Sequence, residues 1–387
     1  EQAYKPDTRV ELELGPGEAA LLKFAGNAAG VTEFLFHNKE GRLDVLYACA
    51  GEPYNSTRVT PQRPRNSRTI SKVDAPEWMQ CDVQCEFRDG IAHVTFLTET
   101  ISAERVRKIQ EDQEKAREAR MDKQRRILTW DDAADIPAFK MVIPGPHDPS
   151  LRQLRQDYEL DKVVAGAAND YERLQRLVKW THDRWKHSGD NTPSKSDPLT
   201  ILAEAKEGKR FRCVEYAIVV TGCAQALGMP ARRLALKRED VETAKSGAGH
   251  VVAEVWLDSF EKWVFVDGQW DVIPEKDGKP LNAVEFQDAI GRKAPNLKLR
   301  SSSDVKEDIY LYWVAPYLYY FDVNLDQQTF GADSDHAEAN RRTPKEGKIM
   351  LVPKGAKNPT IFQGKSPIGN CTYISSPKAF YPNPKTP

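Results

Sequence analysis

The sequence predicts an α+β protein in which β-rich ends flank a central helical part that leads into an antiparallel sheet. Alternating apolar runs fill the first hundred residues, apolar positions recur at helical spacing in the middle of the chain, and three strand patterns follow. A chain of 387 residues is long enough for two or three domains. We expect a β-sandwich (1–101), a charged helical linker (102–140), a central α+β core (141–300) and a C-terminal β segment packed on that core (301–387).

The composition is that of a globular protein and argues against several classes of function. Hydrophobic residues make up 40% of the chain and charged residues 29%. The 56 Lys and Arg balance 57 Asp and Glu, whereas a nucleic-acid-binding domain is usually strongly basic. No apolar run approaches the roughly 18 residues of a membrane-spanning helix. We therefore expect neither a nucleic-acid partner nor a membrane span.

The cysteines and the start of the chain bear on compartment and cofactors. Six cysteines are too few for a disulfide framework in a chain of this length. Cys81 and Cys85 form a lone C-x3-C pair without histidines at zinc-finger spacing, so we expect ordinary thiols, with one disulfide left open, and no metal or cofactor. The chain starts at Glu1 with neither Met nor an apolar segment, from which we expect an extracytoplasmic location, periplasmic or secreted.

Short strands separated by turns are predicted throughout the first hundred residues. Asp89-Gly90 is a hairpin signal in front of the last of them. Their spacing is typical of a β-sandwich. The strand candidates cover residues 10–14, 31–36, 43–47 and 91–97.

Two polar stretches of this part are predicted to lie in solvent. Residues 52–71, rich in Pro, Arg, Ser and Asn, are interpreted as a long exposed loop that contains the glycosylation sequon Asn55-Ser56-Thr57. Residues 102–127 are rich in Glu, Lys, Arg and Gln and predict a capped, exposed helix between domains. An anionic contact for the loop arginines, or a partner contact for the helix, is the alternative.

The central part is predicted to consist of helices followed by a small sheet. Residues 148–205 have helical periodicity, and Asp197-Pro198 begins a short helix that ends at Gly208. A buried helix is expected over residues 213–227. Three strands are expected after it, at 233–237, 250–257 and 263–267, with the last two paired as a hairpin.

Beyond about residue 304 the pattern is interpreted as β structure. Residues 310–321 hold seven aromatic side chains in twelve positions, interrupted by Pro316. Alternation places apolar side chains on both faces, which favours a strand packed between domains. A stacking platform for a sugar or a peptide is the alternative. Further strands are expected at 348–352 and 359–363.

Cys213, His250 and Asp267 form a chemically coherent set. Cys213 starts the predicted buried helix, whose N-terminus stabilises the thiolate form of a cysteine. His250 begins a strand expected beside that helix, where a general base is needed, and Asp267 ends the neighbouring strand, where it would orient the imidazole. This order predicts a catalytic triad with a thiol nucleophile.

The flanks of these residues resemble the transglutaminase-like superfamily. Residues 212–217 (RCVEYA) and 225–232 (QALGMPAR) are similar to its cysteine helix, 250–256 (HVVAEVW) to its histidine strand, and 263–267 (WVFVD) to its aspartate strand. The resemblance covers about residues 171–271 and implies a papain-like α+β core of a bacterial-type member. It also implies an acyl-enzyme mechanism on peptide or protein amides.

Two positions depart from the family pattern, and an alternative function stays open. Phe211 stands where the family usually has Gly, and Val252 where it often has Trp. The backbone N–H of Cys213 is one expected oxyanion donor, and the indole N–H of Trp180 or Trp185 is another candidate. The alternative function is a non-catalytic binding or scaffold protein that retains the fold, with these residues serving only packing and turns.

Overall fold

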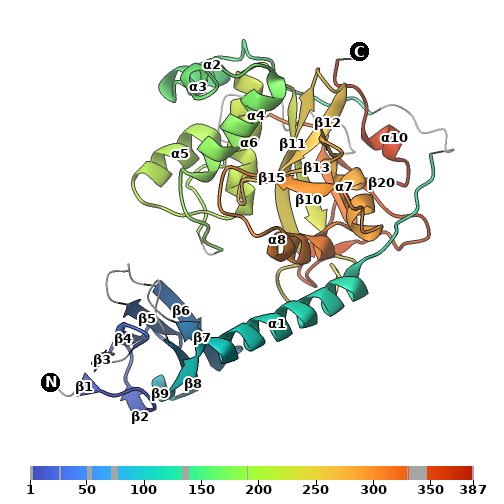
Figure 1. The fold of residues 1–387 in the computed structure, drawn as a ribbon. Coiled ribbons are helices and arrows are strands. Elements are labelled where there is room, and N and C mark those ends of the chain that lie inside the picture. The colour runs from blue at the N-terminus through green and yellow to red at the C-terminus, as the bar shows by residue number, and fades with distance from the viewer. Residues whose placement is uncertain are drawn as a thin grey trace. The chain divides into compact units, whose positions relative to one another are not determined.

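The computed structural model describes residues 3–25, 28–49, 55–70, 77–132, 139–189, 191–328, 330 and 347–385. The chain divides into two compact units, Glu1–Ala119 and Arg120–Pro387 (Figure 1). Helices and several sheets are both present, so the α+β class predicted from the sequence is confirmed.

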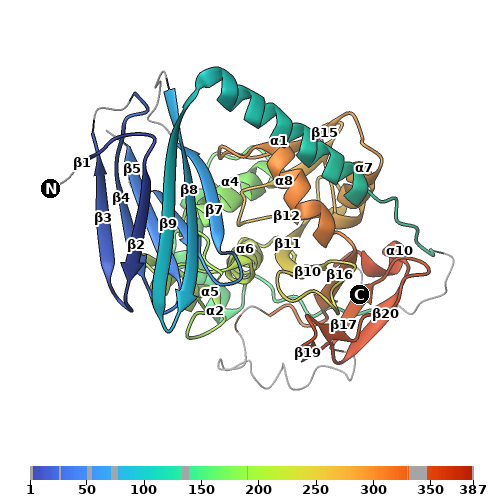
Figure 2. The ribbon, with the colours of Figure 1, turned by 90° about the horizontal axis from the view of Figure 1, so that it is seen from below.

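The first unit consists of two sheets whose apolar faces share one core (Figure 2). Phe34 of one sheet and Phe96 of the other place their ring centroids 4.7 Å apart in that core. One sheet has the order β1 (Ala3–Tyr4), β3 (Ala19–Phe24), β4 (Val31–Asn38), β5 (Leu43–Cys49), β6 (Asn55–Val59). The other has the order β2 (Arg9–Leu14), β9 (Ile91–Ser102), β8 (Glu77–Arg88), β7 (Arg65–Ile70).

The exposed loop predicted over residues 52–71 is wrong where the structure describes it. Strands β6 and β7 occupy most of this stretch, each at the edge of its sheet. Edge strands tolerate charged and polar side chains, so their composition resembles that of a loop. Only Val59 and Ile70 near their ends are buried apolar anchors. Residues 52–54 and 71 lie outside the described residues.

The C-x3-C pair is explained by strand geometry. Cys81 and Cys85 both lie on the core face of β8 and are free thiols. Positions four apart on a strand are separated by about 13 Å, too far for a disulfide or a shared metal ion. Burial, followed by the charge of Glu86, raises the pKa of Cys85 to about 11. The pair therefore behaves as core filling.

The predicted charged helix is confirmed as α1 (Ala103–Gln124), with lysine, arginine and glutamate along most of its length. Its last turn belongs to the second unit, where Met121 enters the core. Four helices follow: α2 (Pro149–Asp157), α3 (Leu160–Val163), α4 (Asp170–His182) and α5 (Pro198–Lys206). Asp197 caps α5 and Pro198 occupies its first turn, as predicted.

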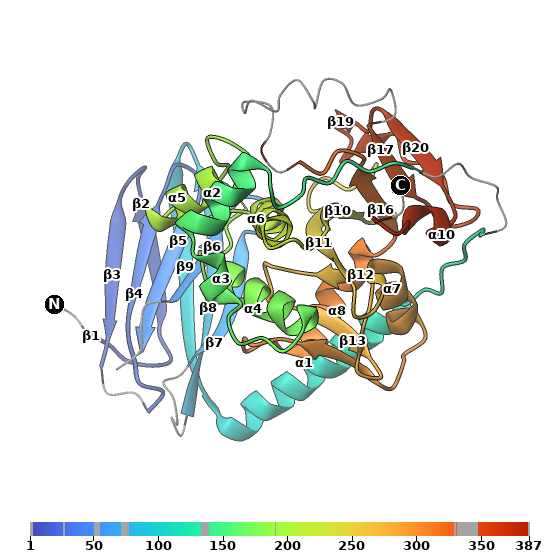
Figure 3. The same ribbon diagram turned by 90° about the horizontal axis from the view of Figure 1, so that it is seen from above.

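The second unit is organised around a six-stranded sheet (Figure 3). Strands from the C-terminal part of the chain are hydrogen-bonded directly to strands from its central part. All its pairings are antiparallel except β17 with β20, which is parallel. The strand order is β12 (Lys262–Val266), β11 (Gly249–Leu257), β10 (Ala231–Lys237), β16 (Tyr320–Asn324), β17 (Lys348–Leu351), β20 (Cys371–Ile374).

Each face of this sheet carries its own core. Helix α6 (Cys213–Ala226), nearly all buried, packs with α2–α5 against one face through side chains such as Val255. On the other face, residues such as Val252 pack with α7 (Ala283–Gly291) and α8 (Glu307–Val314). The smaller elements are β13 (Ile273–Lys276), β14 (Lys279–Pro280), β15 (Leu297–Arg300), η1 (Ala315–Tyr317), β18 (Ile361–Phe362), β19 (Ser366–Pro367) and α10 (Pro377–Phe380).

The strand predicted over residues 310–321 is also wrong. Its first half is the helix α8, followed by the 3-10 turn η1, and only β16 is extended. Tyr310 and Val314, four residues apart, are the fully buried positions of α8, which is helical spacing. A run that is apolar almost throughout fits both the strand and the helix period, so periodicity could not separate them.

Candidate active site

Cys213 is the first residue of α6 and is half-buried. The buried carboxylate of Glu215 accepts hydrogen bonds from the Arg212 backbone N–H at 3.0 Å and from its guanidinium at 2.6 Å, which fixes the start of the helix. Backbone N–H groups in a first turn have no partner inside the helix, and the helix dipole favours negative charge there. The position thus suits a thiolate.

His250 lies near the start of β11 and is 2% exposed. Its Nε2 lies 2.8 Å from Asp267 Oδ2, and the Cys213 side chain is near enough to stabilise the protonated ring. Burial opposes a charged imidazole, but the charge and hydrogen bond of Asp267, and then the Cys213 side chain, outweigh it and raise the pKa of His250 to about 9. The ring is therefore an imidazolium at neutral pH, with a donor for each partner.

Asp267 follows β12 directly and is fully buried. Its Oδ1 accepts the backbone N–H groups of Gln269 and Trp270 at 3.0 and 3.3 Å. Its Oδ2 accepts His250 Nε2 and the Tyr310 hydroxyl, at 2.8 and 2.9 Å. Four donors therefore surround the carboxylate, which is the arrangement that sustains a buried anion.

The turn after Asp267 is closed by reciprocal backbone hydrogen bonds between Asp267 and Val272, at 2.9 and 3.1 Å. Gly268 within it lies against α6, where a Cβ atom would come within 2.9 Å of the Val220 side chain. Glycine is therefore required for the turn to approach the helix that carries Cys213. His182 of α4 adds a hydrogen bond from Nδ1 to the carbonyl oxygen of Gln269, at 2.9 Å.

An aromatic cluster from the C-terminal half of the chain covers this site. The Trp313 ring meets the His250 ring edge-on, with centroids 4.7 Å apart and planes at 75°. Tyr317 lies 6.0 Å from the same imidazole, and Trp270 lies 5.2 Å from Trp313. Sequence reasoning missed these contacts because it placed the segment in a strand. The spacing of Tyr310, Trp313 and Tyr317 at three and four residues was the available signal.

The two departures from the family pattern both point into cores. Phe211 is fully buried, its ring 5.8 Å from that of Trp185 in a perpendicular arrangement. Val252 is buried on the α7 and α8 face of the sheet. Cys213 remains partly exposed beside Phe211, so the larger side chain does not bury the thiol.

The two candidate tryptophans have different surroundings. Trp180 packs against the guanidinium of Arg184, 4.6 Å from its ring centroid, and against Tyr158. Trp185 lies against Tyr216 of α6, with centroids 4.3 Å apart, and is 6% exposed. The Trp185 Nε1 is buried and finds no hydrogen-bond partner within the described residues.

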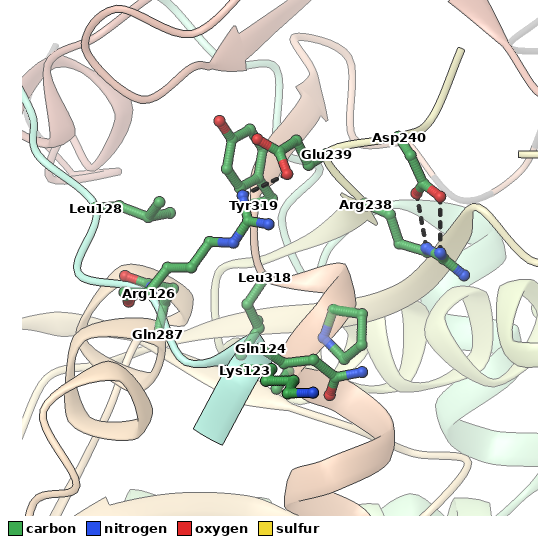
Figure 4. A pocket seen from close by; sticks show the side chains of 12 residues that line it. Lys123, Gln124, Arg126, Leu128, Arg238, Glu239, Asp240, Gln287, Leu318 and Tyr319 are labelled. Atoms are coloured by element: carbon green, nitrogen blue, oxygen red, sulfur yellow. Dashed lines mark hydrogen bonds and ion pairs between the residues drawn. The ribbon is translucent and has the colours of Figure 1, made fainter. Parts of the chain in front are cut away.

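A separate pocket of about 260 Å³ lies beside the segment that follows α8 (Figure 4). The close-up shows Arg126 directed at Glu239 and Arg238 directed at Asp240, with Tyr319 next to the first pair. The two acidic groups of this pocket are thus each paired with an arginine, and Lys123 is a further basic residue in its lining. Cys213, His250 and Asp267 are not among its lining residues.

The parts of the chain that the structure describes contain no group of three or more His, Cys, Asp and Glu side chains arranged to hold a metal ion. No helix of the described ranges is long and apolar enough to cross a membrane.

Comparisons with known proteins give a family for the central residues. Residues 159–268 match the family model of the transglutaminase-like superfamily, and no curated protein matches the chain. Among solved structures, a candidate cysteine protease from Cytophaga hutchinsonii is similar over 76% of this chain and 74% of its own, with 11% identity and a TM-score of 0.26. The periplasmic domain of TgpA from Pseudomonas aeruginosa is similar over 70% of this chain and 87% of its own, with 14% identity and a TM-score of 0.24.

Proposed function

We propose, from the membership of residues 159–268 in the transglutaminase-like superfamily, that this chain is a cysteine-dependent acyl transferase or hydrolase acting on peptide or protein amides. In this proposal Cys213 is the nucleophile, His250 the acid and base, and Asp267 the residue that orients the imidazole. The observation that carries it is the buried His250–Asp267 hydrogen bond next to a half-exposed thiol at a helix N-terminus.

The geometry supports a protonated imidazole beside the thiol. With the pKa of His250 raised to about 9, the imidazole keeps its proton at neutral pH, and the thiolate is the attacking form of cysteine. Attack of the Cys213 sulfur on an amide carbonyl carbon forms the C–S bond, and the carbonyl electrons move to the oxygen. The His250 proton then goes to the leaving amine as the C–N bond breaks, which leaves a thioester.

The second half of the reaction needs a base, and His250 is then neutral. It takes a proton from water in hydrolysis, or from an amine in transfer, as the new bond to the acyl carbon forms and the sulfur leaves. Developing charge on the carbonyl oxygen needs donors, for which we assign the backbone N–H of Cys213. Of the two tryptophans, Trp185 is favoured as a second donor because its buried Nε1 is unpartnered within the described residues.

Alkylation with iodoacetamide tests the proposal. Cys213 should react rapidly at neutral pH, and His250→Gln should slow it about 30-fold at pH 7, since an ordinary cysteine is only a few per cent thiolate there. Mass spectrometry of the digested protein locates the modified residue. A Cys213 that reacts as slowly in wild type as in the His250 variant would favour the scaffold alternative.

Cys371 is a matched control. It is also a half-buried free thiol, but burial, with the charge of Asp322, raises its pKa to about 11. It should stay unmodified while Cys213 reacts. A thiol-reactive peptide probe, compared between wild type and Cys213→Ala, then tests the substrate class. The extracytoplasmic location stays a prediction, for which fractionation of the source cells is the test.

A further inference from the structure

One of the four hydrogen-bond donors of Asp267 comes from a helix far from it in the chain. Three donors come from His250 and from the turn of residues 267–272, whereas the fourth is the hydroxyl of Tyr310 on α8, 2.9 Å from Oδ2. Tyr310 is fully buried and lies more than forty residues beyond Asp267 in the chain. Its hydroxyl donates to Asp267, so we expect any effect on the reaction to pass through that carboxylate.

The two oxygens of Asp267 are held differently. Oδ1 is fixed by two rigid backbone N–H groups, while Oδ2 depends on two side chains, those of His250 and Tyr310. A buried carboxylate oxygen that loses a donor keeps its desolvation cost and is held less firmly. The Tyr310 hydroxyl therefore contributes directly to where Oδ2 points.

Neighbouring groups cannot replace this hydroxyl. Tyr216 of α6 also faces Asp267, whose charge adds to burial in raising its pKa, but its hydroxyl donates to the Trp185 carbonyl oxygen at 2.8 Å. The other ionisable groups that face the imidazole are Cys213 from α6 and Tyr317 from η1. Burial, and then Asp267, raises the pKa of Tyr310 well above its usual value, so it remains a protonated donor.

The same helix also shields the pair from water. Trp313, one turn after Tyr310, lies edge-on against the His250 ring, and both aromatic rings pack against Trp270. Exclusion of water strengthens the His250–Asp267 interaction because the local dielectric is low. Helix α8 thus brings a hydrogen-bond donor and a cover to the same two residues.

We propose that Tyr310 is a positioning residue that holds Asp267 Oδ2 toward His250 and thereby maintains the charged imidazole beside Cys213. This inference rests on the proposed function. It also makes a segment outside residues 159–268 part of the working site.

Direct titration of His250 tests the inference. The imidazole ¹⁵N shifts are followed against pH in wild type, Tyr310→Phe and Tyr312→Phe, and the His250 signals are identified from their loss in His250→Gln. Tyr310→Phe removes one oxygen and keeps the ring packing. It should increase the proton-dissociation constant of His250 about tenfold, the effect of weakening a hydrogen bond to a charged group. Asp267→Asn should shift it further in the same direction.

Tyr312 is the matched control, since it is half-buried on the same helix and its hydroxyl makes no hydrogen bond to the described residues. Its variant should titrate as wild type does. A Tyr310→Phe curve that coincides with wild type, or that moves to higher pH, would overturn the inference. A fall in melting temperature without a shift of the titration would do the same, because packing alone would explain it.

A measurement on the unmodified sequence guards against a variant that fails to fold. With ¹³C at the tyrosine Cζ, the Tyr310 signal should follow the His250 titration, and a Tyr310 signal that is constant through that range contradicts the contact. Iodoacetamide separates the two proposals. If alkylation of Cys213 depends on His250 but Tyr310→Phe reacts like wild type, only the role of Tyr310 fails. If alkylation does not depend on His250, the proposed function fails as well.

Discussion

Two buried charge pairs lie on strand β11, four residues apart, and they have opposite designs. Glu254 pairs with Arg232 directly across the β10–β11 ladder, both side chains are fully buried, and the guanidinium donates to Glu254 Oε2 at 2.9 and 2.6 Å. His250 pairs with Asp267, but its ring also lies near the half-exposed Cys213. We call Arg232–Glu254 the closed pair, because both side chains are fully buried, and His250–Asp267 the open pair, because His250 lies beside a thiol that is partly exposed.

Nearly every polar side-chain atom of the closed pair makes a hydrogen bond. Arg232 Nη1 donates to the Phe380 carbonyl oxygen, and Glu254 Oε1 accepts from the Ala283 backbone and the Tyr381 hydroxyl, all within 2.9–3.1 Å. The ring of Trp263 also lies 4.5 Å from the guanidinium. A guanidinium cannot release its proton in a protein, whereas an imidazolium can. The same strand thus holds a permanent charge where it supports structure and a movable proton where it faces the thiol.

The largest expected effect comes from breaking the closed pair. Glu254→Gln leaves Arg232 buried without its counter-ion, and we expect a loss of about 3–5 kcal/mol in the free energy of unfolding. Denaturant unfolding followed by tryptophan fluorescence measures it, because Trp78 is the one tryptophan of eight that lies in the first unit. Arg292→Ala, which removes an exposed ion pair with Asp288, is the control, expected to cost under about 0.5 kcal/mol. A Glu254 variant within 1 kcal/mol of the control would contradict the assigned role.

The open pair, His250 and Asp267, should make the free energy of unfolding depend on pH. The folded pKa of His250 is raised to about 9 from an ordinary value of about 6.5, so its contribution to stability is complete below about pH 6.5 and is lost as pH rises toward 9. The free energy of unfolding of wild type should therefore fall across this window, and His250→Gln should flatten that fall. If the free energy of unfolding has the same slope against pH in wild type and in His250→Gln, the folded state does not retain the proton on His250. Glu254→Gln should lower the whole curve and leave its slope unchanged.

The smallest change in the free energy of unfolding is expected from a third ion pair, Lys237 with Asp322. Lys237 Nζ lies 2.7 Å from Asp322 Oδ2 and both are nearly buried, but Lys348 lies 3.7 Å from the same oxygen. Lys237→Met therefore leaves Asp322 with a remaining counter-ion, and we expect a loss of about 1–2 kcal/mol. The double variant Lys237→Met, Lys348→Met should lose more than the sum of the single losses. Strict additivity would show that Lys348 does not compensate.

The sequence predicted the part of the site where pattern and chemistry agree. Cys213 opens a buried helix that stops shortly before Gly228, and His250 and Asp267 lie at the two chain ends of an evident hairpin, so their order and spacing could be recognised. Tyr310 and Trp313 could not be recognised, because an aromatic run fits a strand as well as a helix. In the folded unit they belong to the core that also contains Phe286 and Phe321. Edge strands β6 and β7 were not recognised because they contain too few apolar residues to show the period of a strand.

The closed pair has a consequence for how the protein is made. Arg232 bonds to Phe380, the Trp263 indole donates to the Pro382 carbonyl oxygen at 2.8 Å, and β20 completes the sheet of the second unit. A chain still on the ribosome has made Cys213 long before these contacts can form. Since domains fold as units during synthesis, the first unit can fold early, whereas the second must wait for its last residues. The thiol therefore gains its partner His250 only once the second unit has folded, and a chain cut short before α8 lacks part of what keeps that partner in place.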